Sequence, residues 1–156
     1  MTRILGGFTA VAVGVMIIMK SAAVLMAIPK AAPPSVFTTE QAEAGRAAYA
    51  TNCASCHMPD LSGDNEKPPL AGPIFMTNWR SRSTKELLEY VSGAMPFDAP
   101  ALSPETYRAI IAFVLQSNGA TPGTQALAAS TDVLIGAVTA GSGSLSPSAA
   151  SEGESK

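Results

Sequence analysis

The most constraining feature of the sequence is the segment NCASCHMPD, residues 52–60. Its Cys53, Cys56 and His57 are the only two cysteines and the only histidine of the 156-residue chain. In a CxxCH motif, haem is attached covalently through the two thiols, and the adjacent imidazole becomes a ligand of the iron. The motif therefore predicts one haem c, bound through Cys53 and Cys56, with His57 as an iron ligand.

Three other chemistries compete for the same residues. A structural zinc site takes four ligands, and the chain has no further cysteine or histidine to complete the set. A thioredoxin-like redox pair belongs in a βαβ unit, whereas this motif follows a predicted helix and precedes a loop. A plain disulfide is compatible with export but leaves His57 without a role. Haem attachment is the interpretation that uses all three side chains.

Two helices are predicted from capping boxes, in which an N-cap hydroxyl and a side chain three residues later bond to the first turn. Thr38 and Gln41 have this form ahead of EQAEAGRAAYATNC, and Ser83 and Glu86 have it ahead of KELLEYVSG. The first of these helices runs directly into the CxxCH motif. Gly93 is expected to end the second helix in a left-handed conformation.

A third helix is predicted to begin at Ser103 as N-cap with Pro104 in the first helical position, and to be ended by Asn118-Gly119. Apolar residues recur at helical spacing along it: Tyr107, Ile110, Ile111, Val114 and Leu115. No alternating run is long enough for a convincing strand, so the fold class is all-α. Roughly 25 residues rich in proline and glycine separate the first two helices, and a loop of that length usually wraps something functional.

The predicted domain spans residues 36–123, which is enough for one small domain. It contains six Lys/Arg residues and nine Asp/Glu residues, a formal balance of −3. A nucleic-acid-binding protein should present a basic face, so this class of partner is excluded. A domain of this size often needs a bound cofactor to complete its core.

Residues 1–35 read as a signal peptide or N-terminal membrane anchor followed by a Pro-rich linker. Arg3 precedes an apolar run that is interrupted only by Lys20, and residues 21–23 form a small-x-small cleavage site. Without cleavage, residues 4–28 are long enough to anchor the chain in the inner membrane. We therefore expect a periplasmic or exported protein, either soluble after cleavage or membrane-attached.

Residues 124–156 are rich in alanine, serine, glycine and threonine and contain no aromatic residue. Such a composition predicts a disordered, low-complexity tail, because too little apolar surface is available to offset the entropy of ordering. VLIGAV, residues 133–138, is the one part of it suited to transient docking.

The second iron ligand is expected to be Met95, because a methionine thioether is a common partner of histidine in electron-transfer haem proteins. Met95 lies in SGAMPF, where the flanking Gly93 and Pro96 restrict the backbone. A core-filling methionine is the alternative role. Met76, in IFMTNW, is the rival candidate for the ligand.

With these features in place, residues 39–119 resemble a class I c-type cytochrome. The resemblance is carried by GRAAYATNCASCH, PPLAG, GAMPF and LSPETYRAIIAFVLQSNG. It implies a small cytochrome c fold, with three main helices and a long loop around a covalently attached haem. It also implies a close crossing of the first and last helices at Gly45 and Tyr49.

The resemblance further implies roles for residues around the haem. The carbonyl of Pro69 is expected to accept a hydrogen bond from the ring of His57. Trp79 matches an aromatic residue that lines the haem edge near a propionate, although a core anchor is the alternative. Arg80 and Arg82 are candidates to neutralise propionates, with solvent-exposed surface positions as the other interpretation.

As a function, the resemblance implies a one-electron carrier rather than an enzyme. Its expected donor is a periplasmic dehydrogenase, and its expected acceptor is an oxidase or another cytochrome. One alternative is a haem subunit of a periplasmic dehydrogenase complex. Another is a weak peroxidase, if the methionine ligand is labile. The basic docking face of mitochondrial relatives is absent here, so their partners are not implied.

Overall fold

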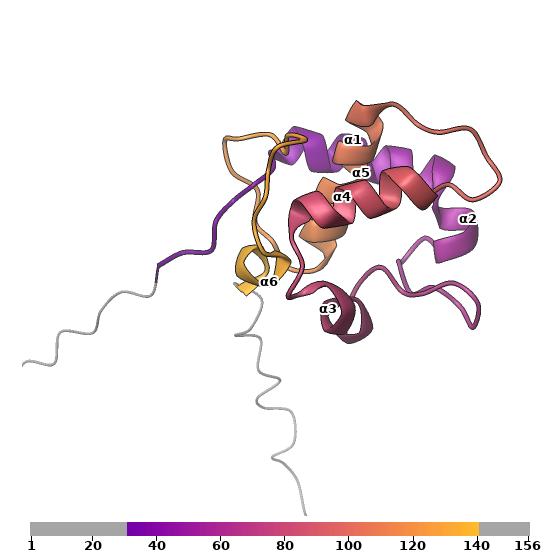
Figure 1. Cartoon of the computed structure of the whole chain (residues 1–156), viewed down its shortest axis with the longest axis horizontal. Helices are drawn as coiled ribbons and strands as arrows, with labels where there is room; N and C mark the ends of the chain where they lie inside the picture. The colour runs from indigo at the N-terminus through magenta and orange to yellow at the C-terminus, as the bar shows by residue number, and fades with distance from the viewer. Residues whose placement is uncertain (1–30, 141–156) are drawn as a thin grey trace, which may run out of the picture. The chain divides into compact units, whose positions relative to one another are not determined.

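The computed structural model describes residues 31–140 and consists there of helices without a strand (Figure 1), so the predicted all-α fold is confirmed. The helices are α1 (Thr39–Asn52), α2 (Ala54–His57), α3 (Pro73–Trp79), α4 (Thr84–Ala94), α5 (Pro104–Ser117) and α6 (Ile135–Val138). None of the helices in this part of the chain is both long and apolar enough to cross a membrane. The predicted signal or anchor segment, residues 4–28, lies outside the described residues.

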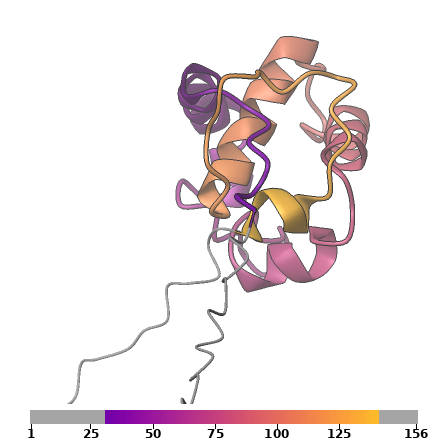
Figure 2. The same cartoon turned by 90° about the vertical axis from the view of Figure 1, so that its left-hand side faces the viewer.

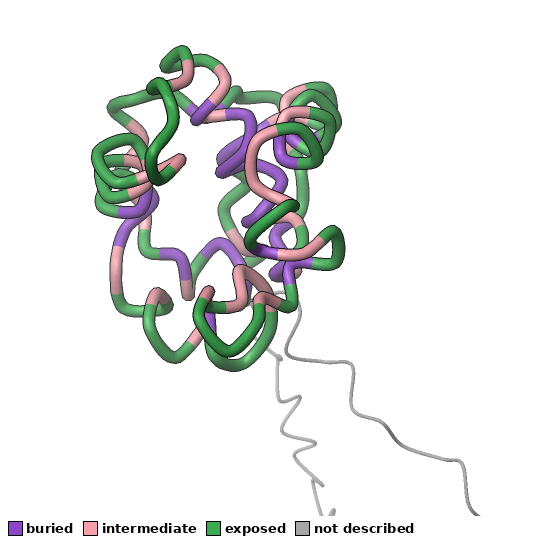
Figure 3. The backbone as a smooth tube through the Cα atoms, turned by 90° about the vertical axis from the view of Figure 1, so that its right-hand side faces the viewer, coloured by how far each residue is buried: buried purple, intermediate pink, exposed green. Residues whose placement is uncertain are grey.

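The core is organised by the crossing of α1 and α5. A Cβ atom added to Gly45 would lie only 1.8 Å from the carbonyl oxygen of Ala109, so the two helix backbones touch at this point. Close by, the rings of Tyr49 and Phe113 pack with their centroids 5.4 Å apart. The predicted crossing at Gly45 and Tyr49 is therefore confirmed. Buried and exposed stretches alternate along the chain in Figure 3, because one side of each main helix faces this core.

The two predicted capping boxes differ in the structure. The box that starts α4 is complete, with Ser83 Oγ accepting from the Glu86 N–H at 3.2 Å and Glu86 Oε2 accepting from the Ser83 N–H at 2.8 Å. At α1, Thr38 Oγ1 accepts from the Gln41 N–H at 3.2 Å, but the Gln41 side chain turns away to Leu127. Only half of the first box is therefore formed.

The expected left-handed stop at Gly93 is wrong. Gly93 lies inside α4, which continues to Ala94 and is capped by Met95 in an extended conformation, with φ −132° and ψ 148°. The helix ends there because Pro96 follows, and a proline disfavours the helical conformation of the residue before it. The predicted start and end of α5 are confirmed, with Ser103 as N-cap.

The expectation of disorder from residue 124 onward is wrong for residues 124–140, which we call the C-terminal strap. The strap leaves the end of α5, passes the first turns of α1 and α4, and finishes as α6 beside α3 (Figure 2). It buries Leu127, Ile135 and Val138, whose exposed fractions are 2%, 0% and 1%. The remainder of the predicted tail, residues 141–156, lies outside the described residues.

Backbone hydrogen bonds help to explain why a segment with so few large apolar side chains is ordered. The N–H groups of Ile135 and Gly136 donate to the carbonyls of Arg82 and Arg80, both at 2.9 Å. The buried hydroxyl of Thr84 donates to the carbonyl of Thr131 at 2.8 Å. These bonds join the backbone of the strap to the domain, and the three buried apolar side chains add to them.

Candidate haem site

Both cysteines and the histidine lie on one short turn between α1 and the loop that follows α2. The N–H of Cys53 donates to the carbonyl of Tyr49 at 2.9 Å, which attaches the turn to the end of α1. The carbonyl of Cys53 accepts from the N–H groups of Cys56 and His57, at 3.1 and 2.9 Å. A single turn of backbone therefore holds the three chemically active side chains in a fixed order.

Both thiols are free, with Cys53 half-buried and Cys56 exposed. Burial raises the pKa of the Cys53 thiol, and the neighbouring Cys56 raises it further. Because the two thiols are not joined as a disulfide, both are available for thioether formation. Among residues 31–140 no group of three or more His, Cys, Asp and Glu side chains is arranged to hold a metal ion, so the zinc alternative lacks a ligand set.

The imidazole of His57 is held in one tautomer by the loop that follows it. Its Nδ1 lies 3.0 Å from the carbonyl oxygen of Pro68, and the side chain is only 8% exposed. Since a carbonyl can only accept, Nδ1 carries the proton and Nε2 keeps its lone pair. The imidazole is therefore prepared to bind a metal through Nε2.

The carbonyl that orients His57 belongs to Pro68, so the expectation of Pro69 is wrong by one residue. The loop is closed by a hydrogen bond from the Leu70 N–H to the Leu61 carbonyl at 2.9 Å. Within it, Gly63 adopts φ 63° and approaches Lys67 so closely that a Cβ atom would lie 2.3 Å from the Lys67 carbonyl oxygen. This loop closure decides which of two adjacent proline carbonyls faces the ring.

A carboxylate stabilises the same loop. Asp64 Oδ1 accepts from the backbone N–H groups of Glu66 and Lys67, at 2.8 and 2.7 Å. These two bonds hold the pKa of the Asp64 carboxyl below its ordinary value, because they favour the charged form. The segment that carries the Pro68 carbonyl is therefore fixed by local bonds of the chain itself.

Tyr49 holds the far end of the CxxCH turn. Its buried hydroxyl donates to the carbonyl of Met58 at 2.7 Å and lies 3.2 Å from the carbonyl of His57. Burial, with smaller contributions from Cys53 and Asp60, raises the pKa of Tyr49 to about 12, so the phenol remains a donor. The family resemblance implies only a packing role for Tyr49. The one signal of a polar role in the sequence is the tyrosine itself, because a phenylalanine would pack equally well there.

Met95, the expected second ligand, lies at the end of α4 and is half-buried. Its N–H donates to the carbonyl of Val91 at 2.9 Å, and its carbonyl accepts from the hydroxyl of Tyr107 at 2.7 Å. The backbone of this methionine is therefore held from two helices, α4 and α5.

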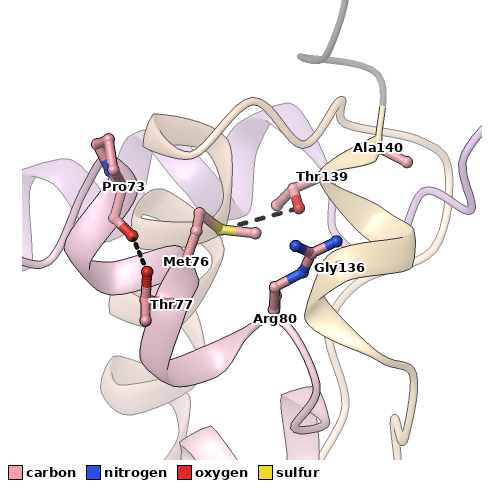
Figure 4. Close-up of a pocket in the computed structure, with 7 residues that line it drawn as sticks. All are labelled: Pro73, Met76, Thr77, Arg80, Gly136, Thr139 and Ala140. Atoms are coloured by element: carbon pink, nitrogen blue, oxygen red, sulfur yellow. Dashed lines mark hydrogen bonds between the residues drawn. The ribbon is translucent and has the colours of Figure 1, made fainter.

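Met76, the rival candidate, lies on α3 beside a cavity of about 350 Å³ between α3 and α6. Its sulfur faces the hydroxyl of Thr139 at 3.9 Å (Figure 4). Arg80 and Gly136 line the same cavity. The side chain of Met76 is thus directed toward the C-terminal strap.

Trp79, the aromatic residue expected near the haem edge, belongs to a cluster of aromatic rings on α3 and α4. Trp79 packs on Tyr90 with ring centroids 5.5 Å apart, and on Phe75 at 6.3 Å. The guanidinium of Arg82 lies 4.2 Å from the Trp79 ring centroid and pairs with Glu86 at 3.5 Å. Trp79 therefore contacts α4 through Tyr90, and Arg82 has partners within the protein.

Comparison with known proteins gives one family. Residues 40–114 match the sequence model of the family described as cytochrome c oxidase, cbb3-type, subunit III. No curated protein and no solved structure matches the chain. The matched segment contains the CxxCH turn, Met95 and most of the α1/α5 crossing.

The residues of the site fit the cofactor of this family. Two free thiols are separated by one turn, and the adjacent imidazole keeps the lone pair of Nε2 because its Nδ1 donates to Pro68. This is the donor set that covalent haem attachment requires. Residues 40–114 are therefore a c-type cytochrome domain, an electron-transfer module with covalently bound haem c and iron, whose partners are other redox proteins.

Proposed function

We propose that the chain is an exported monohaem electron carrier in a respiratory or dehydrogenase-linked chain. Cys53 and Cys56 would form the thioethers that hold the haem, and His57 and Met95 would be the ligands of its iron. The observation that carries the proposal is the bond between His57 Nδ1 and the Pro68 carbonyl, which leaves Nε2 for the metal. Haem c, when bound, supplies an iron centre that gains and loses one electron.

The role of the chain is to keep both ligands in place while the charge of the iron changes. On the histidine side, Pro68 orients the ring and Tyr49 holds the backbone that carries it. On the methionine side, α4 and α5 each bond to the Met95 peptide groups. Ligands held this firmly favour electron transfer over substrate binding, because neither needs to move during the redox cycle.

Met95 is preferred to Met76 for a physical reason. The sulfur of Met76 is directed at Thr139 in the C-terminal strap, whereas Met95 follows α4 on a backbone fixed on both sides. Moving Met76 to the iron would remove its contact with the strap. Iron binding by Met76 would therefore require a rearrangement that iron binding by Met95 does not.

The acidic balance of the domain, six basic against nine acidic residues in 36–123, favours redox partners that do not rely on a basic docking face. We propose a periplasmic dehydrogenase as donor and an oxidase or another cytochrome as acceptor. The N-terminal pattern, residues 4–28, supports a periplasmic location with or without attachment to the inner membrane.

A second candidate is a haem-bearing subunit that stays bound to a larger enzyme. The family description, which names an oxidase subunit, favours this alternative. Purification of the full chain from a native membrane or periplasmic fraction distinguishes the two. A free carrier elutes alone, whereas a subunit elutes with a large oxidase or a flavin- or quinone-containing dehydrogenase.

The ligand assignment is tested by Met95→Ala in the haem-loaded protein. The variant should retain haem, because the thioethers and His57 remain. It should lose the far-red band of ferric thioether coordination, bind carbon monoxide when reduced, and show a lower reduction potential, since the soft ligand that favours Fe(II) is gone.

Met76→Ala is the matched control and should leave the band, the potential and carbon monoxide binding near wild type. Loss of the band in Met76→Ala but not in Met95→Ala would reassign the ligand while leaving the cytochrome intact. A far-red band that survives both substitutions would contradict His/Met ligation altogether.

The export proposal has its own test. Without residues 1–23, the chain should remain in the cytoplasm without haem in a host whose attachment machinery is periplasmic. Normal covalent haem in that truncated protein would contradict it. Mass spectrometry of the mature full-length protein would distinguish a cleaved signal from an anchor.

A further inference from the structure

Tyr107 makes a polar contact that its place in the apolar stripe of α5 does not require. The side chain is 4% exposed, so its ring belongs to the core. Its hydroxyl nevertheless donates to the carbonyl of Met95 at 2.7 Å and accepts from the N–H of Leu102 at 3.0 Å. A phenylalanine would fill the same volume, so the hydroxyl serves the two backbone groups.

These two backbone groups are the ends of the loop between α4 and α5. The residues in the middle of this loop, 97–101, are all exposed, so the loop has little core packing of its own. Asp98 within it adopts φ 56°, a conformation that non-glycine residues rarely occupy. The Tyr107 hydroxyl therefore closes the loop at the point where it joins the packed domain.

The same contact completes the support of the Met95 backbone. On the N-terminal side, the Met95 N–H is bonded to Val91 in the last turn of α4, at 2.9 Å. On the C-terminal side, only the Met95 carbonyl remains to be fixed, and Tyr107 of α5 bonds to it. The Cα atom from which the thioether extends is thereby held between two helices.

We propose that Tyr107 is a positioning residue for the iron ligand Met95, which acts by keeping the thioether-bearing backbone against α5. The inference rests on the proposed role of Met95. Without the hydroxyl, the loop end would be free to move away from α5, and the Met95 side chain would be held less firmly for binding the iron. The consequence is a larger population of protein with an open iron position.

The test is Tyr107→Phe in the full-length, haem-loaded protein, with Tyr90→Phe as the matched control. Tyr90 is half-exposed and packs by its ring on Trp79, so loss of its hydroxyl should change little. Tyr107→Phe should retain haem and helical circular dichroism. It should bind carbon monoxide about tenfold faster than wild type, the effect of losing roughly one hydrogen bond that holds the closed form. Its far-red band should also be lost at a lower temperature.

The positioning role would be overturned if Tyr107→Phe bound carbon monoxide at the wild-type rate and kept its far-red band to the wild-type temperature. If Met95→Ala changed both properties in the same experiment, the ligand assignment would stay intact. A far-red band retained in Met95→Ala would overturn the ligand assignment and this inference with it. A lower unfolding midpoint alone would also overturn it, because a purely structural hydroxyl gives that result.

If Tyr107→Phe fails to fold, 3-fluorotyrosine in place of Tyr107 provides a second test. This replacement keeps the ring and the hydroxyl but makes the phenol a stronger donor. Carbon monoxide binding should then be slower than in wild type. An unchanged or faster rate would overturn the proposal.

Discussion

The α1/α5 crossing and the C-terminal strap both contribute to the core of the domain, but they are held in different ways. At the crossing, two regular helices touch at Gly45 and Ala109, and each satisfies its own backbone hydrogen bonds. The strap is irregular over most of its length. Several of its N–H and carbonyl groups are paired with residues far away in sequence, namely Gln41, Arg80, Arg82 and Thr84.

This difference separates two sources of stability. The crossing depends on shape, because one absent Cβ atom allows the helix backbones to touch. The strap depends on a few buried side chains and on hydrogen bonds that form only after α1, α3 and α4 are in place. A change at the crossing should therefore disturb the whole domain, whereas a change in the strap should first loosen the strap.

The largest effect is expected from Gly45→Ala. The added Cβ atom would lie 1.8 Å from the Ala109 carbonyl oxygen, so α1 and α5 must move apart, at a cost of roughly 3 kcal/mol or more. Gly93→Ala is the matched control, because no atom lies within 4 Å of a Cβ atom there. Gly93→Ala should be neutral or stabilising by up to about 1 kcal/mol. Denaturant unfolding of the haem-loaded protein measures both, and equal effects would contradict the close crossing.

A smaller loss is expected from Ile135→Ala in the strap. Ile135 is fully buried, so its truncation should reduce the free energy of unfolding by about 2–3 kcal/mol. The neighbouring Leu134 is 54% exposed, and Leu134→Ala should change stability by less than about 0.5 kcal/mol. If the two variants unfold at the same denaturant concentration, the strap is not packed as described.

The smallest effect is expected from Gln41→Ala, which removes both hydrogen bonds between this side chain and Leu127, at 3.1 and 2.7 Å. The loss should be about 1–2 kcal/mol. Hydrogen exchange at the Leu127 amide should become faster while α1 stays protected. Glu86→Ala, which breaks the complete capping box of α4, is the comparison and should leave the Leu127 amide protected. Fast exchange in both variants would mean that Gln41 does not hold the strap.

The sequence by itself determined the features that depend on neighbours along the chain. The starts of α1, α4 and α5 follow from Thr38, Ser83 and Ser103, because an N-cap bonds to an amide two or three residues away. The CxxCH turn is equally local, so its three side chains and the haem they predict could be found without a fold. Gly45 was identified only through a family resemblance, since a glycine in a helix does not indicate by itself which backbone lies opposite.

Only the tertiary structure decided which residues, distant in sequence, bond to the side chains and loops that the sequence identifies. The choice of Pro68 over Pro69 depends on the closure of a loop, and the Gln41 side chain leaves its capping box because Leu127 offers it two backbone partners. Tyr107 lies in the apolar stripe of α5. Its hydroxyl can bond to the Met95 carbonyl only because the loop between α4 and α5 folds back against α5. Composition predicts disorder in the strap because it counts only the surface that a segment can bury on itself. Its order comes instead from three buried apolar side chains and from hydrogen bonds to Gln41 and to residues 80–84.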